Sequence, residues 1–221
     1  MLTRSEEDHL KAIYGLQQAG PSAFTKDIAE RLSTKASSVT DMLKKLAEKG
    51  FVKHAPYHGA TLTAKGRRQA LMLVRKHRLW ETFLVQRLGF GWDEVHEVAE
   101  QLEHVSSEKL IERLDAYLEH PTFDPHGDPI PDRAGRLPER TTRPLAECAA
   151  GDRVILAAVG NGSDSLLKLL DAKGLVLGAM LEVLGREEFD GSLDLRVKQG
   201  AAMNVSALVA GHLLTIPADR R

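Results

Sequence analysis

The sequence has one cysteine, few aromatic residues and no long hydrophobic run. A single cysteine, Cys148, excludes an internal disulfide framework and is typical of a reducing compartment. No apolar segment approaches the roughly 18 residues that span a bilayer, and the N-terminus lacks the hydrophobic core of a signal peptide. Aromatic residues make up only 5% of the 221 positions, which leaves few walls for an apolar ligand pocket. We therefore expect a cytoplasmic protein with no membrane partner.

The charge of the chain is unevenly distributed. The formal net charge is −1, but residues 1–76 contain 14 Lys and Arg against 7 Asp and Glu. The rest of the chain contains 16 basic and 24 acidic side chains. A basic first third on a nearly neutral chain indicates an anionic partner, although a solvated charged surface would give the same composition.

Residues 1–65 have the pattern of a winged helix-turn-helix DNA-binding domain. The predicted elements, in chain order, are helices over 5–18, 25–32 and 36–49 and a hairpin over 51–63. Ser5 is the expected N-cap of the first helix, and Gly50 the residue that ends the third. The order of these elements, their short loops and the basic charge together favour this fold over other small helical domains.

In a winged helix-turn-helix, the third helix enters the major groove with its N-terminal residues at the base edges. The residues expected near bases are Lys35, Ser37, Ser38 and Asp41. The residues expected near phosphates are Thr25, Lys26, Thr40 and Lys44. For the serines and Thr40, helix capping is an equal alternative. Tyr57 and His58 are candidates for backbone contacts from the hairpin.

The remaining chain predicts a helical domain, a linker and a small β domain. Residues 66–122 contain a long helix that ends near Leu88 and a second helix from Asp93 toward Leu118. Their many leucines indicate either a dimer interface or an intramolecular core. Residues 123–147 are rich in proline and predict a linker. Residues 148–221 contain short β-type runs separated by glycine, with one helix at 165–172, which is typical of a small barrel.

Seven side chains form the candidate metal-ligating set. The second long helix carries His96, Glu100, Glu103 and His104 within an arc of roughly 100°. The first long helix carries His77 and Glu81 one turn apart, and the N-terminal helix adds Asp8. Such a stripe is either a hydrated acidic face with incidental histidines or a site for a divalent cation. Oxygen-rich ligands with one or two imidazoles favour Mn(II) or Fe(II), while Zn(II), Co(II) and Cd(II) are expected to bind in vitro.

Several segments resemble one known family, the metal-dependent regulators related to the diphtheria toxin repressor and the manganese transport regulator. The resemblance is carried by EDHLKAIYGL, DIAERLSTKASSVTDMLKKLAEKGFV, LTAKGRR, RKHRLWETFL, HEVAEQLEHVSSEKL and PHGDPIP. It spans residues 5–131, and the C-terminal part is similar to the SH3-like domain of the longer, three-domain members. The implied fold is mainly α with a small β domain, in which a winged helix-turn-helix precedes a helical dimerisation domain and an SH3-like barrel.

The resemblance also implies how the ligands are divided. The implied primary site contains Asp8, Glu100, Glu103 and His104, and the implied ancillary site contains His77, Glu81 and His96. Members that respond to iron have methionine and cysteine where this chain has Asp8 and Glu100, so manganese is favoured. Lys11 stands where short manganese regulators have a ligating glutamate, which implies two separated sites. Asp164, in the segment 161–165, is a candidate ligand from the third domain or a surface carboxylate.

The expected function is metal-dependent transcription regulation, with a homodimer bound to a pseudo-palindromic double-stranded DNA operator. The resemblance implies repression of metal-uptake genes, in the service of metal homeostasis. An Fe(II)-responsive member of the same family is the first alternative, and a winged-helix regulator that senses a small organic ligand is the second. A metallohydrolase is disfavoured because the chain has no nucleophile motif, phosphate loop or H-E-x-x-H pair. We therefore do not expect an enzyme.

Overall fold

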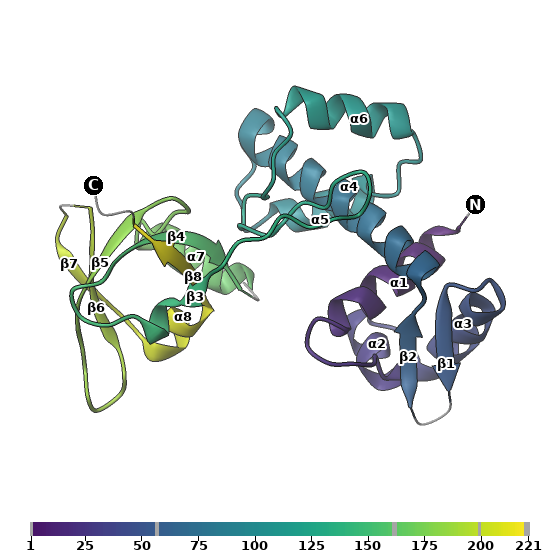
Figure 1. Cartoon of the computed structure of the whole chain (residues 1–221), viewed down its shortest axis with the longest axis horizontal. Helices are drawn as coiled ribbons and strands as arrows, with labels where there is room; N and C mark the ends of the chain where they lie inside the picture. Colours follow the sequence, from purple (N-terminus) through teal and green to yellow (C-terminus); the bar gives the residue numbers. More distant parts are fainter. Residues whose placement is uncertain (1, 56–57, 161–162, 199, 219–221) are drawn as a thin grey trace. The chain divides into compact units, whose positions relative to one another are not determined.

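The computed structural model describes residues 2–55, 58–160, 163–198 and 200–218 (Figure 1). The chain forms two compact units, each assembled from separated segments. The first unit contains residues 1–80, 99–119 and 130–137, and the second contains residues 81–98, 120–129 and 138–221. The predicted mainly α fold with a small β domain is confirmed.

The N-terminal elements form the predicted winged helix-turn-helix. They are α1 (Arg4–Leu16), α2 (Thr25–Arg31), α3 (Ala36–Glu48), β1 (Val52–Ala55) and β2 (Gly59–Leu62). The two strands pair antiparallel from Val52 opposite Leu62, and Figure 1 shows this hairpin beside the three helices. Leu10, Ile28 and Leu43 are fully buried between the helices, so the apolar stripes of the sequence form one core.

The expected cap of the first helix was wrong, and the capping alternative for Ser37 and Ser38 is excluded. The N-cap of α1 is Thr3, whose hydroxyl accepts a bond from the backbone N–H of Glu6, while the Glu6 carboxylate accepts from the N–H of Thr3. This reciprocal pair is a capping box, and Thr3 with Glu6 has its spacing, whereas the expected cap, Ser5, lies inside the helix. The N-cap of α3 is Lys35 without a side-chain bond, so Ser37 and Ser38 belong to the first turn and do not cap it.

The helical region contains three helices where two were predicted. They are α4 (Ala64–Leu88), α5 (Val95–Leu102) and α6 (Glu108–Tyr117). The continuous helix expected from Asp93 toward Leu118 was wrong, because Ser107 starts a new helix by accepting a bond from the N–H of Leu110. No helix in the described part of the chain is long and apolar enough to cross a membrane.

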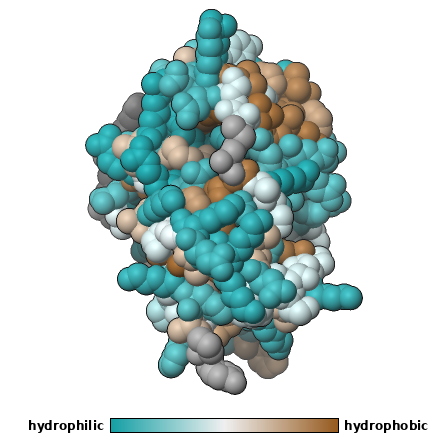
Figure 2. All heavy atoms as spheres, turned by 90° about the vertical axis from the view of Figure 1, so that its right-hand side faces the viewer, coloured by the Kyte–Doolittle hydropathy of each residue, from teal (hydrophilic) through white to brown (hydrophobic). Residues whose placement is uncertain are grey.

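Most of the predicted leucine surface is buried within the chain. Leu79, Leu84 and Leu114 are at most 6% exposed, which favours an intramolecular core for these positions. On α6, Leu110 and Tyr117 remain 41% and 59% exposed. Figure 2 shows a mostly hydrophilic face with one hydrophobic patch in its upper part. Part of the apolar surface of α6 is therefore exposed to solvent in the single chain.

The second unit contains an antiparallel sheet whose strand order is β3-β8-β4-β5-β6-β7. The strands are β3 (Arg143–Pro144), β4 (Arg153–Val159), β5 (Met180–Arg186), β6 (Leu193–Val197), β7 (Ala202–Val205) and β8 (Leu213–Pro217). The helices are a short 3₁₀ helix η1 (Leu145–Glu147), α7 (Asp164–Ala172) and α8 (Ala207–His212). The core contains Leu156, Leu170 and Leu181, all fully buried, so the sheet and α7 share one apolar interior. The predicted runs form β4, β5, β6, β8 and α7, whereas β3, β7 and α8 were not predicted.

The proline-rich segment is ordered by turns. Asp124 accepts backbone N–H bonds from His126 and Asp128, and Asp132 forms the same kind of turn further along. The guanidinium of Arg140 lies 3.3 Å from the ring centre of Phe123 and donates to the carbonyl of Ala157. The segment predicted as a linker, residues 123–147, therefore contains residues that are held in place by turns and side-chain contacts.

Candidate metal centre

Asp8, Glu103 and His104 come together from two distant parts of the sequence. One possible ligand atom from each lies within 4.8 Å of the others. The Nε2 atom of His104 is 3.1 Å from Oδ1 of Asp8 and 3.7 Å from Oε1 of Glu103. Asp8 belongs to α1, while Glu103 and His104 directly follow α5. The group therefore links the DNA-binding helices to the helical region within the first unit.

The ring of His104 is oriented by Glu7, a residue that the sequence analysis did not single out. The Nδ1 atom of His104 lies 2.7 Å from Oε2 of Glu7, so Nδ1–H donates to this carboxylate. In the neutral ring, Nε2 then carries the lone pair and faces Asp8 and Glu103. Metal-ligating histidines in proteins commonly have this carboxylate partner on the other ring nitrogen.

Glu103 uses its two oxygens differently. Oε1 faces His104, while Oε2 lies 2.6 Å from both the ammonium of Lys11 and Nδ1 of His77. Burial raises the pKa of Glu103, but the bond from His77 and the positive charge of Lys11 outweigh it, so the pKa is below its ordinary value. The side chain is only 2% exposed and is held as a carboxylate.

Asp8 has the opposite electrostatic balance. Burial raises its pKa, and although His104 and Arg4 act against this, the net pKa is above the ordinary value. The nearby charge of Glu103 contributes to the increase. A neighbouring cation would favour the charged form of Asp8 and lower its pKa.

The structure does not bring Glu100 into this group. Its side chain is 52% exposed, and its Oε1 atom lies 3.9 Å from the ammonium of Lys11. Lys11 points between Glu100 and Glu103 and pairs more closely with Glu103. The ligand role of Glu100 stays a prediction.

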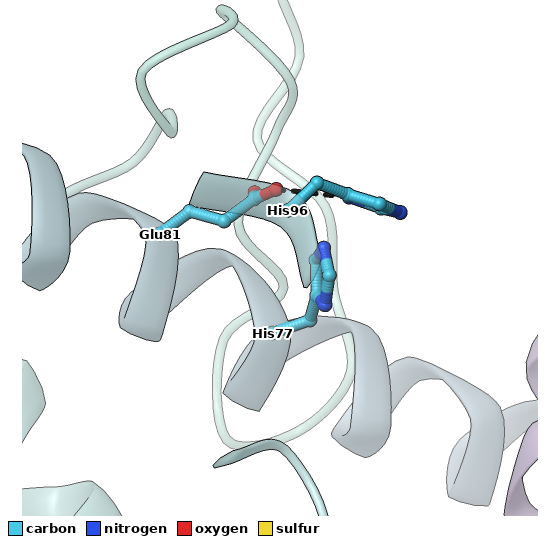
Figure 3. Close-up of side chains that lie close together, drawn as sticks. All are labelled: His77, Glu81 and His96. Carbon is cyan, nitrogen blue, oxygen red and sulfur yellow. Dashed lines mark hydrogen bonds and ion pairs between the residues drawn. The ribbon is translucent and has the colours of Figure 1, made fainter. Parts of the chain in front are cut away.

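The second group contains His77, Glu81 and His96, shown in Figure 3. His77 and Glu81 lie one turn apart on α4, as their spacing predicts, and His96 comes from α5. Nδ1 of His96 is 3.3 Å from Oε1 of Glu81, which is 3% exposed, whereas His96 is 58% exposed. Nδ1 of His77 donates to the Glu103 carboxylate, so in the neutral ring Nε2 is the nitrogen that carries the lone pair. Glu103 thus orients one member of this group while facing the other group.

Asp164 is not part of any ligand group among the described residues. It lies in the first turn of α7, whose N-cap is Ser163. Two positions of the expected segment, 161 and 162, lie outside the described residues, as does Tyr57 of the hairpin.

The residues expected to contact DNA lie on the surface of α2 and α3. The exposed members are Lys26, Lys35, Ser37, Ser38, Asp41 and Lys44, while Thr25 and Thr40 are partly buried. The hydroxyl of Thr40 donates to the carbonyl of Ala36, and the ammonium of Lys44 lies 3.4 Å from Asp41. Lys26 and Lys35 present their ammonium groups at the start of α2 and α3, respectively.

These features define a winged-helix protein with a carboxylate- and imidazole-rich centre. A family model described as the iron-dependent repressor N-terminal DNA-binding domain matches residues 1–60. The model of the iron-dependent repressor metal-binding and dimerisation domain matches residues 63–132, and that of the FeoA domain matches residues 143–214.

Comparison with single proteins gives the same result. The chain is 38% identical over 130 residues to the iron-dependent repressor IdeR of Mycobacterium leprae, a match that covers 59% of this chain and 56% of IdeR. A structure titled manganese-dependent transcriptional repressor in complex with manganese is 39% identical, with a TM-score of 0.86 and coverage of 96% of this chain and 99% of that one. A structure of ScaR with bound Cd²⁺ is 34% identical, with a TM-score of 0.76, and the match covers 96% of this chain and 99% of that chain. The protein belongs to the diphtheria toxin repressor family of metal-dependent transcriptional regulators.

Proposed function

We propose that this protein is a Mn(II)-responsive, DNA-binding transcriptional repressor that acts as a homodimer on metal-uptake genes. The observation that carries this proposal is the convergence of Asp8 with Glu103 and His104. Asp8 belongs to the DNA-binding helices, and the other two residues follow α5. The family's repressors are not enzymes, and the role proposed here is regulatory.

The donor set fits a divalent cation. Asp8 and Glu103 offer oxygen, and His104 offers a nitrogen whose lone pair is fixed by Glu7. A bound cation would supply positive charge between carboxylates that otherwise repel each other. Ligand sets rich in oxygen and without thiolate favour Mn(II) or Fe(II). The similar proteins include an iron-dependent repressor, a manganese-dependent repressor and a structure with bound Cd²⁺, so Fe(II) is the alternative to Mn(II) and Cd(II) is expected to bind in vitro.

The proposed link to DNA binding passes through α1. Asp8 and Glu6 belong to the same helix, and the buried Glu6 carboxylate lies 3.0 Å from the ammonium of Lys45 and 2.6 Å from that of Lys49. Both lysines lie at the C-terminal end of α3, the helix proposed to enter the major groove. When Asp8 is held against Glu103 and His104, α1 and with it α3 take a fixed place relative to the segment after α5.

In a dimer, this arrangement sets the spacing of two recognition helices on a pseudo-palindromic operator. The apolar side chains of Leu110 and Tyr117 on α6 support the proposal that this region contributes to the dimer interface. A bound cation would hold α1 and α3 in the DNA-binding arrangement beforehand, so less conformational entropy would be lost when the protein binds DNA. Coupling between effector and DNA is typically about 1–3 kcal/mol.

The test is equilibrium binding of the apo protein to DNA from upstream of its own gene and of candidate manganese transporters. Mn(II) and Fe(II) are titrated separately, without oxygen and at fixed salt. Specific binding that requires metal is expected, with Mn(II) the stronger activator at equal free concentration. A stronger response to Fe(II) would assign the protein to the iron-responsive alternative, which its likeness to IdeR favours. Equally strong specific binding in chelator would contradict metal control.

Asp8→Ala is expected to remove metal-dependent DNA binding and leave the fold and the dimer unchanged. The change deletes the ligand that joins α1 to Glu103 and His104. DNA-binding isotherms with and without Mn(II) measure the first effect, and sedimentation and thermal unfolding measure the second. Asp194→Ala, an exposed aspartate on β6, is the matched control and should respond to Mn(II) like the unmodified protein. An unchanged metal response in Asp8→Ala would rule out the linking role.

A further inference from the structure

Three side chains of α1 contact the segment that follows α5, and two of these contacts need no metal. The ammonium of Lys11 donates to Oε2 of Glu103 at 2.6 Å. The carboxylate of Glu7 accepts from Nδ1–H of His104 at 2.7 Å. Glu7 and Asp8 lie four and three positions before Lys11, so the three side chains share one face of the helix. The two parts of the chain that a cation at Asp8 would join are therefore already joined by protein side chains.

The contact between Lys11 and Glu103 is largely shielded from solvent. The two side chains are 20% and 2% exposed. A charge-assisted hydrogen bond in such surroundings is stronger than an ion pair between two surface side chains. The same ammonium lies 3.2 Å from Nδ1 of His77 and 3.9 Å from Oε1 of Glu100. Lys11 is thus held against several groups of the helical region, with Glu103 as its closer carboxylate.

Lys11 also supplies a positive charge where carboxylates gather. Glu7, Asp8 and Glu103 all lie within 4 Å of the ring nitrogens of His104. Like charges at such separations repel each other. Burial raises the pKa of both Asp8 and Glu103, and the charge of Lys11 acts against this increase in both. The ammonium therefore stabilises the charged carboxylates when no metal is bound.

A cation and Lys11 would use different oxygens of Glu103. Oε2 accepts from Lys11, whereas Oε1 faces His104 at 3.7 Å. A cation held by Asp8, His104 and Oε1 of Glu103 leaves the bond at Oε2 in place. The two links between α1 and Glu103 thus add to each other and do not compete.

From these contacts we infer that the pairs Lys11–Glu103 and Glu7–His104 form a metal-independent latch, which holds α1 near its DNA-binding arrangement before a cation binds. Lys11 is a positioning residue in this latch. It sets the DNA affinity of the metal-free protein, and with it the factor by which metal raises that affinity. The inference rests on the proposed function, because it concerns the basal level of the same DNA binding.

The test compares three variants of the full-length protein. Lys11→Met keeps most of the aliphatic stem and removes the charge, while Lys11→Arg is the conservative variant and keeps the charge. Lys76→Met makes the same change at a partly buried lysine of α4 and is the matched control. Equilibrium binding to operator DNA is measured at fixed salt, in chelator and with saturating Mn(II). Glu7 is left unchanged because it also orients His104.

Lys11→Met is expected to lower the DNA affinity of the metal-free protein by about 3- to 10-fold, since one charge-assisted bond supplies part of the usual coupling. Saturating Mn(II) should restore the affinity, because the cation joins the same two parts of the chain. The metal-induced increase is then larger than in the unmodified protein, whereas Lys11→Arg and Lys76→Met stay close to it. An equal loss with and without Mn(II) would assign Lys11 a direct contact with DNA and overturn the inference, as would no loss in chelator.

Hydrogen exchange measured by mass spectrometry tests the latch without DNA. In the metal-free protein, Lys11→Met should exchange faster than the unmodified protein over residues 4–16 and 99–107, and Mn(II) should remove the difference. Unchanged exchange of these segments in the metal-free variant would overturn the latch, whatever the protein binds. Specific DNA binding by the unmodified protein that ignores Mn(II) would instead contradict the proposed function, so the two failures are distinguishable.

Discussion

At the scale of single residues, Glu103 has the most consequential position. One of its oxygens faces the group with Asp8 and His104, and the other accepts from His77 of the second group. Under the proposed metal assignment, Glu103 is a ligand in one group and orients His77 in the other, so it would couple the two groups.

Glu103→Gln is therefore expected to weaken Mn(II) binding at both groups, whereas Asp8→Ala weakens one. Loss of an orienting partner typically lowers metal affinity about 10- to 100-fold, and loss of a ligand lowers it at least as much. Mn(II) titrations monitored by electron paramagnetic resonance measure both affinities. Glu97→Gln, at an exposed position on α5, the helix that Glu103 follows, serves as the control. If Glu103→Gln lowers the Mn(II) affinity of only one group, then Glu103 is not needed to orient His77 for metal binding.

Glu6 is a buried carboxylate paired with two lysines, and its lowered pKa links stability to pH. Burial raises its pKa, but bonds from Lys49, the Thr3 backbone and Lys45 outweigh it and lower the pKa from 4.5 to about 2. A carboxylate whose pKa is lower in the folded state stabilises the protein above its unfolded pKa, and this contribution is lost as the pH falls through the folded value.

Glu6→Gln is expected to lower the free energy of unfolding by about 1–3 kcal/mol at neutral pH, because it removes charge-assisted bonds to two lysines. The difference from the unmodified protein should be constant above about pH 5 and shrink between pH 4.5 and about 2. Denaturant unfolding at several pH values measures it. A difference that persists unchanged at pH 2 would contradict the assigned role of the carboxylate charge.

At the scale of elements, the sequence predicted helices and strands with strong periodicity and missed those defined by distant contacts. The spacing of His77 and Glu81 placed both on one face of α4. The break between α5 and α6 was missed because a cap at Ser107 competes with a continuous apolar pattern. The two-residue strand β3 and the short strand β7 exist only through pairing with β8 and β6, which no local signal encodes.

The start of α4 depends on a glycine. A Cβ atom at Gly66 would lie 2.0 Å from the carbonyl oxygen of Phe51, at the start of the hairpin. Gly66→Ala is expected to destabilise the protein by about 1–3 kcal/mol, since backbone must move. Gly20→Ala, where a Cβ meets no atom within 4 Å, is the control and should change stability little. Thermal unfolding compares the two, and equal stabilities would contradict the close contact.

The turn at Gly127 offers a second test of the same kind. Gly127→Ala forces an unfavourable φ and a contact with the Ala157 carbonyl, so the turn must leave β4. The close contact and the positive φ are expected to lower the free energy of unfolding by about 1–3 kcal/mol. Thermal unfolding measures this, with Gly20→Ala again as the control. A stability equal to that of the unmodified protein would contradict the close approach of this turn to β4.

At the scale of the whole molecule, the family resemblance predicted how the candidate ligands divide into two groups, and the structure brings both groups together except for Glu100. The partners that orient these ligands were not predicted. Glu7 and Lys11 were not recognised as partners of His104 and Glu103, because the contacts join α1 to residues more than 90 positions away. Helical spacing placed Glu100 on the same face as Glu103, and the resemblance implied a shared site; in the structure Glu100 is half exposed and lies near Lys11. Helical periodicity shows which residues share one face of a helix. Which residues from other elements contact that face depends on tertiary packing.

The most direct test of the account is reciprocal linkage between metal and DNA. Mn(II) affinity is measured by competition with a chelating indicator, with and without saturating operator DNA, for the unmodified protein and Asp8→Ala. Thermodynamic reciprocity requires that DNA raise Mn(II) affinity by the same factor by which Mn(II) raises DNA affinity, typically about 5- to 150-fold. The account predicts this equality for the unmodified protein and no effect of DNA in Asp8→Ala. Mn(II) affinity that does not change on adding operator DNA would contradict it.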